Sequence, residues 1–543
     1  MKNIGPRIPY GRSTSEYPFG TRSTRRKTKV GNLVFVRLPC ISSVASVVQD
    51  LSVRCLAATT ALALLAACTV GPDYVRPVAD KPVAYKEIEG WKTAQPRDQE
   101  LRGKWWEAYN DPLLNGMLEQ VSISNQNLVQ AAAQFRQARA LVQVARAGYL
   151  PSVSAGAGVT RSQSSSGFIS QNQNLTARGP STSYSLSLDA AWEPDLWGRV
   201  RRTVEANEAG AQASAGDLVA LRLSIHAELA QDYFQLRALD TQKQLFDDTL
   251  TAYQRTLTLT QNQYTAGVAA KVDVIQAQTQ LKTTQAQALD IGVQRAQLEH
   301  AIALLLGKPA SDYSLPPASL AALPPAVPLG VPSALLERRP DIAAAERRVN
   351  AANAQIGVAE AAYYPSLTLS ADGGYQSSRF SHWLTVPSRF WSVGPALAQT
   401  LFDGGLRRAQ TDQAIAAYDA NVAGYRQTVL TGFKEVEDSL VALRILEEEA
   451  AVQDEAVQNA RQSVALTTNQ YKAGIVSYLN VVTVQATALA NERTAVDILN
   501  RRLAASVQLI KALGGGWKAT DLPTPDELAR GEPFPRKEAV PMR

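Results

Sequence analysis

Two kinds of hydrophobic periodicity alternate along the chain, and the same order occurs twice. Apolar and polar residues alternate over residues 152–162, 182–192, 366–376 and 390–400. A period of two over about ten residues predicts a strand with one apolar face, and ~9–11 tilted residues are enough to cross a bilayer. The apolar positions are Val153, Ala155, Ala157, Val159, Tyr184, Leu186, Leu188, Ala190, Trp192, Leu367, Leu369, Ala371, Tyr375, Trp391, Val393, Pro395 and Leu397. We therefore expect two pairs of membrane-length strands.

After each strand pair the apolar spacing changes to three and four, and proline disappears. No proline occurs between Pro194 and Pro309, or between Pro395 and Pro523. This pattern predicts long amphipathic helices of ~60 residues, which would reach ~90 Å at 1.5 Å per residue. The apolar series are Leu218, Leu221, Ile225, Leu229, Tyr233 and Leu236, then Ile415, Tyr418, Val422, Tyr425, Val429, Phe433, Val436, Leu440 and Leu443.

The two halves are copies of one plan. The segment "QNQYTAG" from Gln261 returns as "TNQYKAG" from Thr468, and Leu306-Gly307 returns as Leu513-Gly514, both 207 residues later. Internal repetition of this kind indicates a repeated structural unit. We assign the first repeat to 111–308 and the second to 335–515. An extended segment (68–110) precedes them, a proline-rich linker (309–334) joins them, and a polar, solvated tail (516–543) follows.

Four strands are too few to close a barrel, because a barrel with a filled interior already needs about eight. An open sheet edge in lipid would leave backbone groups unpaired, at several kcal/mol each. Other copies of the chain must then supply the missing strands. Two copies would give eight strands and no water channel, whereas three would give twelve, so a conduit favours a trimer.

Charge and cysteine content separate the first 67 residues from the rest. The formal net charge is +6, but ten of the 55 basic residues and only two of the 49 acidic ones precede Cys68, leaving 45 basic and 47 acidic residues afterwards. The positive charge therefore belongs to the leader and does not indicate a nucleic-acid partner. All three cysteines, Cys40, Cys55 and Cys68, lie within the first 68 residues, which excludes a disulfide framework downstream.

The leader ends in an apolar stretch, "LAATTALALLAAC", that is too short to span a membrane and has the proportions of a signal peptide. Leu65-Ala66-Ala67 resembles a lipobox, with cleavage between Ala67 and Cys68 and attachment of diacylglycerol and an N-acyl chain to Cys68. The alternative is a chance cysteine in an ordinary secretory signal. Thr69 stands where an inner-membrane retention signal would show Asp, so the resemblance implies that the lipoprotein is transported to the outer membrane. Residues 1–52 fit a signal peptide poorly, so we hypothesise a translation start near Val53.

Several motifs resemble the outer-membrane factor family of TolC-like channels, in the lipoprotein branch typified by NodT and OprM. They are "CTVGPDYVRP", "WWEAYNDPLLNGMLEQ", the stretch from Leu335 to Ser370 with "RRPDI" and "AYYPS", and the paired Tyr-x-Ala-Gly turns. The resemblance implies an α+β membrane protein: a trimeric, twelve-stranded outer-membrane β-barrel, continued by a long periplasmic α-helical barrel with a mixed equatorial domain. It also implies a passive outer-membrane duct that works with a periplasmic adaptor and an inner-membrane pump of the resistance-nodulation-division (RND) type.

The resemblance also predicts a periplasmic gate where the helix pairs turn, at Gly267 and Gly474. In the family, a tyrosine of the second pair and an aspartate of the first hold the tip closed. Tyr471 and Asp273 match these positions, and we predict that they hydrogen-bond. Asn480 and Thr483 stand at the expected acidic positions and Val476 at the basic one, so the aperture is less charged than in the family. The alternative is an exposed aspartate and a packed tyrosine without coupling.

No residues form a catalytic or metal-binding pattern. His226, His300 and His382 are scattered, and we expect each on a helix surface or in a loop rather than in a metal site. "LGGGW" from Leu513 is not followed by the lysine/serine pattern of a phosphate-binding loop and is typical of a helix end. We therefore expect no enzyme and no cofactor beyond the lipid on Cys68. Two other functions remain open: a duct for type I protein secretion, and a periplasmic coiled-coil lipoprotein without a pore.

Overall fold

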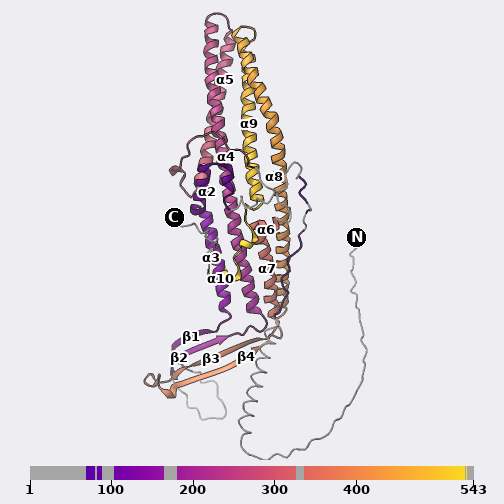
Figure 1. Ribbon diagram of the computed structural model, residues 1–543. Helices are drawn as coiled ribbons and strands as arrows, with labels where there is room; N and C mark the ends of the chain where they lie inside the picture. Colours follow the sequence, from indigo (N-terminus) through magenta and orange to yellow (C-terminus); the bar gives the residue numbers. More distant parts are fainter. Residues whose placement is uncertain are drawn as a thin grey trace, which may run out of the picture. The chain divides into compact units, whose positions relative to one another are not determined.

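The computed structural model describes residues 69–79, 82, 84–87, 103–163, 180–325, 335–531 and 534, all in one compact unit. The leader 1–67 and Cys68 lie outside the described residues. Within this unit, long helices run side by side in pairs and a single antiparallel sheet adjoins the base of the helices (Figure 1). The fold is therefore mixed, with helices and strands in separate regions.

Two helical hairpins repeat with identical lengths. Helix α4 (Arg199–Thr265) and helix α8 (Leu406–Lys472) each have 67 residues, and α5 (Lys271–Leu305) and α9 (Tyr478–Ala512) each have 35. Every one of these boundaries recurs 207 residues later, which is the offset seen in the sequence. The predicted long helices are confirmed, and α4 and α8 are slightly longer than expected.

Shorter helices precede each strand pair and pack along the long ones. They are η1 (Trp105–Tyr109), α2 (Pro112–Ser124) and α3 (Gln126–Ala147) in the first half, and α6 (Leu335–Arg338) and α7 (Pro340–Ala361) in the second. Asp111 begins α2 by accepting hydrogen bonds from the backbone nitrogens of Leu113 and Leu114. The segment predicted as extended over 68–110 thus contains a short helix, and Trp105, Trp106 and Tyr109 of this helix are buried.

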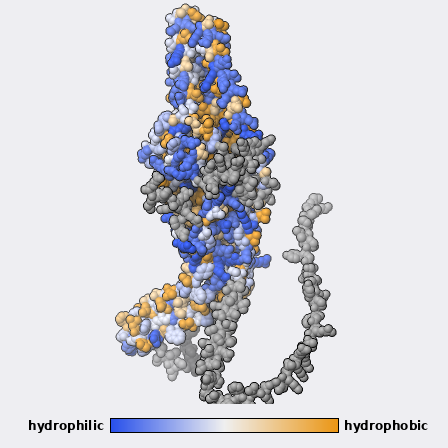
Figure 2. All heavy atoms as spheres, in the orientation of Figure 1, coloured by the Kyte–Doolittle hydropathy of each residue, from blue (hydrophilic) through white to orange (hydrophobic). Residues whose placement is uncertain are grey.

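The strands lie in chain order, β1-β2-β3-β4, and every neighbouring pair is antiparallel. Their bounds are β1 Ser152–Ser162, β2 Ser181–Trp192, β3 Ser366–Ser377 and β4 Arg389–Ala398. Strand β4 ends two residues before the predicted end. The predicted apolar positions share one face, because Ala157 lies opposite Leu186, Leu186 opposite Tyr375, and Gly373 opposite Trp391. Hydrophobic residues are widespread on the exposed sheet (Figure 2).

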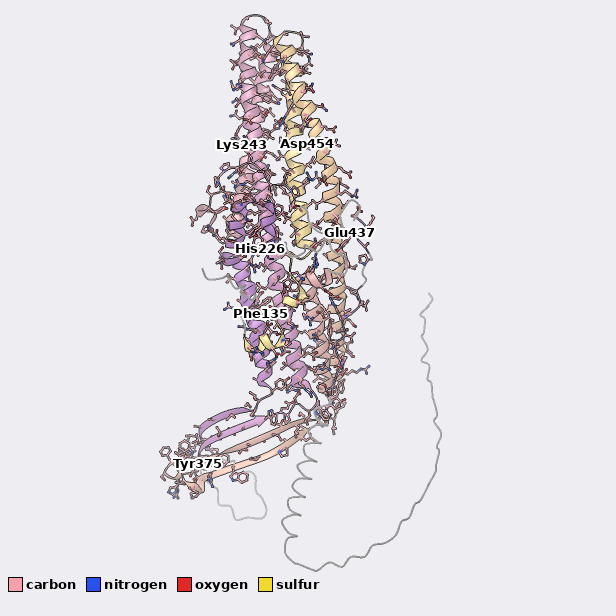
Figure 3. The ribbon with its side chains drawn as sticks, viewed as in Figure 1. Phe135, His226, Lys243, Tyr375, Glu437 and Asp454 are labelled. Atoms are coloured by element: carbon pink, nitrogen blue, oxygen red, sulfur yellow. The ribbon has the colours of Figure 1, made fainter. Side chains whose placement is uncertain are left out.

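The main core lies among the helices, away from the sheet. The predicted positions from Tyr425 to Leu443 are buried in α8, whereas Ile415, nearer the sheet, is 42% exposed. The C-terminal tail was predicted to be solvated, but part of its described residues, 516–531 and 534, packs against the helices. Leu522 and Leu528 are buried against α3 and α4, and Phe534 packs against Phe135 with ring centroids 5.4 Å apart (Phe135 is labelled in Figure 3). Helix α10 (Pro525–Arg530) follows the short η6 (Ala519–Asp521).

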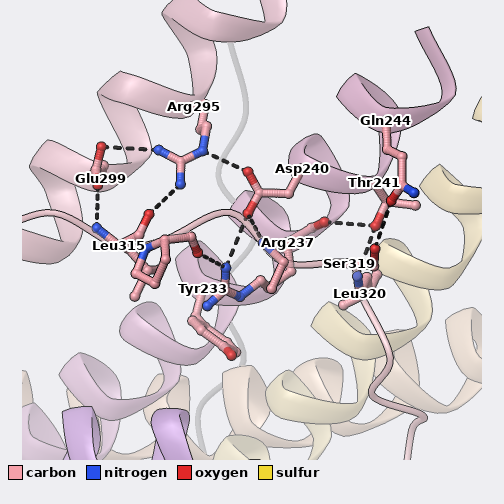
Figure 4. A network of polar contacts seen from close by, with 12 residues as sticks. Tyr233, Arg237, Asp240, Thr241, Gln244, Arg295, Glu299, Leu315, Ser319 and Leu320 are labelled. Atoms are coloured by element: carbon pink, nitrogen blue, oxygen red, sulfur yellow. Dashed lines mark hydrogen bonds and ion pairs between the residues drawn. The ribbon is translucent and has the colours of Figure 1, made fainter. Parts of the chain in front are cut away.

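The proline-rich linker begins with η2 (Ala310–Asp312) and is then held by a buried ionic network (Figure 4). Asp240 of α4, nearly inaccessible, pairs with Arg237 at 3.1 Å and with Arg295 of α5 at 2.6 Å. Arg295 also donates to the carbonyl oxygen of Leu315 at 2.5 Å, and Asp240 accepts from the Ala318 nitrogen at 3.0 Å. The carboxylate thus ties the linker to both helices of the first hairpin.

Candidate gate at the helical tip

Both helical hairpins turn at a glycine whose backbone is left-handed. The φ angles are +74° at Gly267 and +75° at Gly474, a region that favours glycine. The nitrogens of Gly267 and Val268 donate to the carbonyl oxygens of Tyr264 and Gln263, which closes the end of α4. Gly474 and Ile475 repeat this pattern at the end of α8. Both predicted helix-tip turns are therefore present.

The Tyr471 side chain joins the second hairpin to the first. It is 7% exposed. Its hydroxyl donates to the Gln263 side-chain oxygen at 2.7 Å and lies 3.1 Å from the Thr260 hydroxyl, which itself donates to the Thr256 carbonyl oxygen. Because Thr260 and Gln263 belong to α4 and Tyr471 to α8, these bonds link the two repeats at the tip.

The predicted hydrogen bond between Tyr471 and Asp273 is wrong. Asp273 lies in the first turn of α5, where its carboxylate accepts from the backbone nitrogen of Ala270 at 3.1 Å. A carboxylate in this position satisfies a donor of its own helix and meets the positive end of the helix dipole. The Asp273 carboxylate therefore bonds within its own helix turn, which costs little conformational entropy. The Tyr471 hydroxyl bonds to Gln263 and Thr260 of α4 instead.

The other predicted gate positions are exposed. Asn480 and Thr483 lie on the outer part of α9, and the Thr483 hydroxyl donates to the Leu479 carbonyl oxygen at 2.9 Å. Val476 is partly buried in the tip cluster described next. Neither Asn480 nor Thr483 carries a charge, so the second hairpin contributes no carboxylate at these two positions.

Tyr478 is a buried tip residue that the sequence analysis did not identify. Its ring lies 5.7 Å from that of Tyr471, and both belong to a cluster with Leu257, Ala277 and Val481. Burial is the main cause that raises the pKa of Tyr478 to about 12, so its hydroxyl stays protonated. The signal was the helical spacing of three, four and three between Tyr478, Val481, Gln485 and Ala488, which are all buried in α9.

The predicted lipid site, Cys68 with the cleavage position Ala67, lies outside the described residues. The chain immediately after it is fixed at the junction of β2 and α4. The Val70 nitrogen donates to the Trp197 carbonyl oxygen at 3.2 Å. Buried Arg202 of α4 donates to the carbonyl oxygens of Val70 and Gly71 at 3.3 and 3.2 Å and pairs with Asp73 at 3.0 Å. We call residues 69–74 the N-terminal strap.

The strap also contacts the second repeat. The Asn353 amide of α7 donates to the Pro72 carbonyl oxygen at 2.9 Å, and the Tyr74 hydroxyl donates to the Glu346 carboxylate at 2.5 Å. Close by, the Trp197 ring stacks on Tyr364, with centroids 4.8 Å apart. The strap, which begins one residue after Cys68 in the sequence, is therefore held by both repeats near the ends of the strands.

The three histidines lie apart, and the described residues contain no cluster of three potential metal ligands. His300 and His382 are exposed, as expected. His226 was wrongly predicted to lie on the surface. It is buried among the helices (Figure 3), edge-on to Trp106 with centroids 4.9 Å apart, and its Nε2 lies 2.9 Å from the Ser122 hydroxyl. Burial, together with Arg222, lowers its pKa to about 3.

No described helix combines the length and apolar character needed to cross a membrane. A four-stranded sheet with an apolar face, joined to paired long helices that turn at glycines, is a fold that this chain shares with a solved outer-membrane channel. The chain belongs to the outer membrane efflux protein family, whose model matches residues 117–308 and 331–515. These two matched segments correspond closely to the two repeats.

Named relatives agree with this family. The toluene efflux pump outer membrane protein TtgF of Pseudomonas putida is 31% identical over 83% of this chain and 95% of its own length. The pyoverdine export outer membrane protein OpmQ of Pseudomonas aeruginosa is 30% identical over 86% and 98%. Among solved structures, the outer-membrane channel OprN is 32% identical, with a TM-score of 0.76 over 83% of this chain and all of that one. The protein is thus an outer-membrane component of an efflux system.

Proposed function

We propose that three copies of this chain form the passive exit duct of a tripartite efflux system. Each copy would supply four strands to a twelve-stranded barrel and two long hairpins to a periplasmic helical barrel. The sheet order carries this proposal, because among the described residues β1 and β4 each have a strand neighbour on one side only. In a bilayer, unpaired edges cost several kcal/mol per backbone group, and pairing β4 of one copy with β1 of the next removes that cost.

The partners follow from the efflux role. A periplasmic adaptor would dock on the helical tip, and an inner-membrane RND-type pump would supply energy and substrate. The duct would then need no catalytic site and would pass small molecules such as drugs. Two relatives are named for toluene and pyoverdine, which are both small molecules, and this favours efflux over the secretion of a protein.

We propose further that Cys68 carries diacylglycerol and an N-acyl chain and anchors the protein in outer-membrane lipid. The strap supports this placement, because Val70 and Gly71 are bound beside the start of α4, close to the inner end of β2. Mass spectrometry of the mature N-terminal peptide should find a triacylated Cys68. An unmodified peptide that begins upstream of Cys68 would contradict both the anchor and the cleavage between Ala67 and Cys68.

Engineered disulfides test the trimer directly, since the sequence contains no cysteine after Cys68. Cysteines placed pairwise on β1 and β4, for example Ser154→Cys with Ser392→Cys or with Ala396→Cys, should give covalent trimers upon oxidation in at least one register. The single variant Ser154→Cys is the matched control and should stay monomeric on a denaturing gel. The purified protein should also conduct ions in planar bilayers. Monomers in every register, without conductance, would favour the coiled-coil lipoprotein.

A further inference from the structure

Arginines lie at the end of the sheet that is remote from the helices, on its apolar face. Opposite residues of antiparallel strands share a face, and Arg389 of β4 lies opposite Tyr375 of β3. On β1, Arg161 lies two residues beyond Val159, which is opposite Tyr184 of β2. The same face thus ends in Arg161, Tyr184, Tyr375 and Arg389, with Tyr375 labelled at this end in Figure 3.

The β3–β4 connection folds onto this end of the face. It contains η4 (Phe380–His382) and η5 (Val386–Ser388). The rings of Phe380 and Trp383 lie 5.5 and 6.2 Å from that of Tyr184, and 5.9 Å from each other. Phe380 is nevertheless 68% exposed and Val386 75% exposed. The connection therefore extends the apolar face of the sheet without covering its own hydrophobic residues.

The positive charge here is not balanced by acidic residues. The sequence has no Asp or Glu between Asp372 and Asp403, nor from Ser152 to Leu188. Arg161, Arg379 and Arg389 are exposed, and none forms an ion pair within the described part of the chain. Exposed guanidinium groups beside aromatic and aliphatic side chains match an anion that is joined to an apolar body.

We propose that this surface binds the phosphorylated glycolipid of the outer leaflet, the lipid A part of lipopolysaccharide. The inference rests on the proposed function, because it needs the sheet to cross the outer membrane with the helices on the periplasmic side. Arg161, Arg379 and Arg389 bind the glucosamine phosphates. Phe380, Trp383 and Trp391 contact the acyl chains and the headgroup boundary, where aromatic rings concentrate in membrane proteins.

Two features favour this lipid over other occupants. The face is continuous with the lipid-facing side of the strands, where Trp391 and Val393 are 75% and 72% exposed. Three arginines without acidic neighbours suit a ligand with more than one phosphate better than a zwitterionic phospholipid, whose own amine balances its single phosphate. A second copy that stacked its own apolar face on this one would bring the same positive charges against it and would be repelled, unlike a copy that pairs edge to edge with the strands.

The test compares diphosphorylated lipid A with a dephosphorylated lipid of the same acyl chains, by native mass spectrometry of the full-length protein in detergent. The wild-type protein should prefer the phosphorylated lipid. Each of R161Q, R379Q and R389Q should lower that affinity about fivefold, as expected for one arginine at an anionic lipid surface. Arg255→Gln removes an arginine of α4 that is also exposed and should leave the affinity unchanged.

The experiment separates this inference from the proposed function. Equal binding of both lipids, or an unaltered preference in R379Q and R389Q, would overturn the lipid A site. Arg379 lies between strands rather than in one, so R379Q keeps the test valid if a strand variant fails to fold. Phe380→Ala with Trp383→Ala should weaken both lipids alike. A wild-type protein without conductance in planar bilayers would contradict the duct, whatever lipid it binds.

Discussion

At the scale of single residues, the Tyr471 hydroxyl forms a hydrogen-bonded link between the two hairpins. It has partners on α4 only, Gln263 and Thr260, and the ring is fixed against Tyr478. A buried neutral hydrogen bond contributes roughly 1 kcal/mol, and three copies would repeat it around a trimer. The hydrogen bonds between α8 and α4 at the tip therefore contribute only a modest energy.

Tyr471→Phe and Gln263→Ala should therefore loosen the tip. We expect each variant to raise single-channel conductance or the rate of channel opening in planar bilayers, because the link between α4 and α8 is lost. Asp273→Ala is the control from the same region, since its carboxylate caps α5 without touching Tyr471. A larger effect from Asp273→Ala than from Gln263→Ala would restore the gate expected from the family resemblance.

The tyrosine that joins the two hairpins at the tip could be predicted from the sequence, but its hydrogen-bond partner could not. Tyr471 could be located from the repeated Tyr-x-Ala-Gly turn. Asp273 has two possible partners, and the choice depends on the first turn of α5, where the Ala270 nitrogen needs an acceptor. The burial of His226 was mispredicted for a related reason. A histidine in an amphipathic helix can face the core when a serine such as Ser122 forms a hydrogen bond with its ring nitrogen.

Burial of His226 makes the helical body sensitive to acid. Its pKa is about 3 in the folded protein against an ordinary value of 6.5. Between these values the unfolded chain binds a proton that the folded chain does not, so stability is lost as pH falls through 6.5 towards 3. His226→Gln should lose less stability than the wild-type protein between about pH 7 and about pH 4.5, measured by urea unfolding. Equal losses of stability in the two proteins would show that groups other than His226 determine the pH dependence of unfolding.

At the scale of elements, the described part of the linker, residues 309–325, is fixed by polar contacts with α4 and α5 and by the burial of Leu315. Prolines predicted a connector without regular structure, and this part could be read from the sequence. The contacts of Leu315 with Arg295 and of Ala318 with Asp240 could not be predicted from the sequence. They join residues more than a dozen positions apart, and Arg295 and Asp240 lie on two different helices. The tail was misjudged for the same reason, since Leu528 and Phe534 are isolated apolar residues whose burial depends on α3.

Asp240→Ala should destabilise the linker and the first hairpin together. It leaves Arg237 and Arg295 without their shared carboxylate, and breaking a buried ion pair of this kind costs ~3–5 kcal/mol. We expect lower resistance to urea and faster proteolysis within residues 309–325. Lys243→Ala breaks the solvent-exposed pair with Asp247 on the same helix and should cost under ~1 kcal/mol. Similar effects of the two variants would contradict the role of burial.

At the scale of the whole molecule, the sheet has one apolar face, which suits contact with lipid, and one polar face, which suits a water-filled bore. The repeat, the strand bounds and the apolar face were all predictable, because periodicity encodes them. The pairing of β2 with β3 joins the two halves and depends on their three-dimensional arrangement. This pairing places Asp189 directly opposite Asp372 on the polar face. Like charges in this position destabilise a sheet unless water screens them, as it would inside a bore.

Ion selectivity should therefore depend on these two carboxylates. In a trimer six of them would surround the bore, each pair supported by hydrogen bonds from Ser187 to Asp189 at 3.0 Å and from Ser392 to Asp372 at 2.5 Å. Asp189→Asn with Asp372→Asn should shift the reversal potential under a salt gradient towards zero, because the bore then loses its preference for cations. Asp312→Asn, in the exposed η2 of the linker, removes an acidic group outside the sheet and should leave selectivity intact. An unchanged reversal potential in the double variant would mean that the polar face does not line the conducting path, since a charge ring in a narrow water-filled pore must act on passing ions.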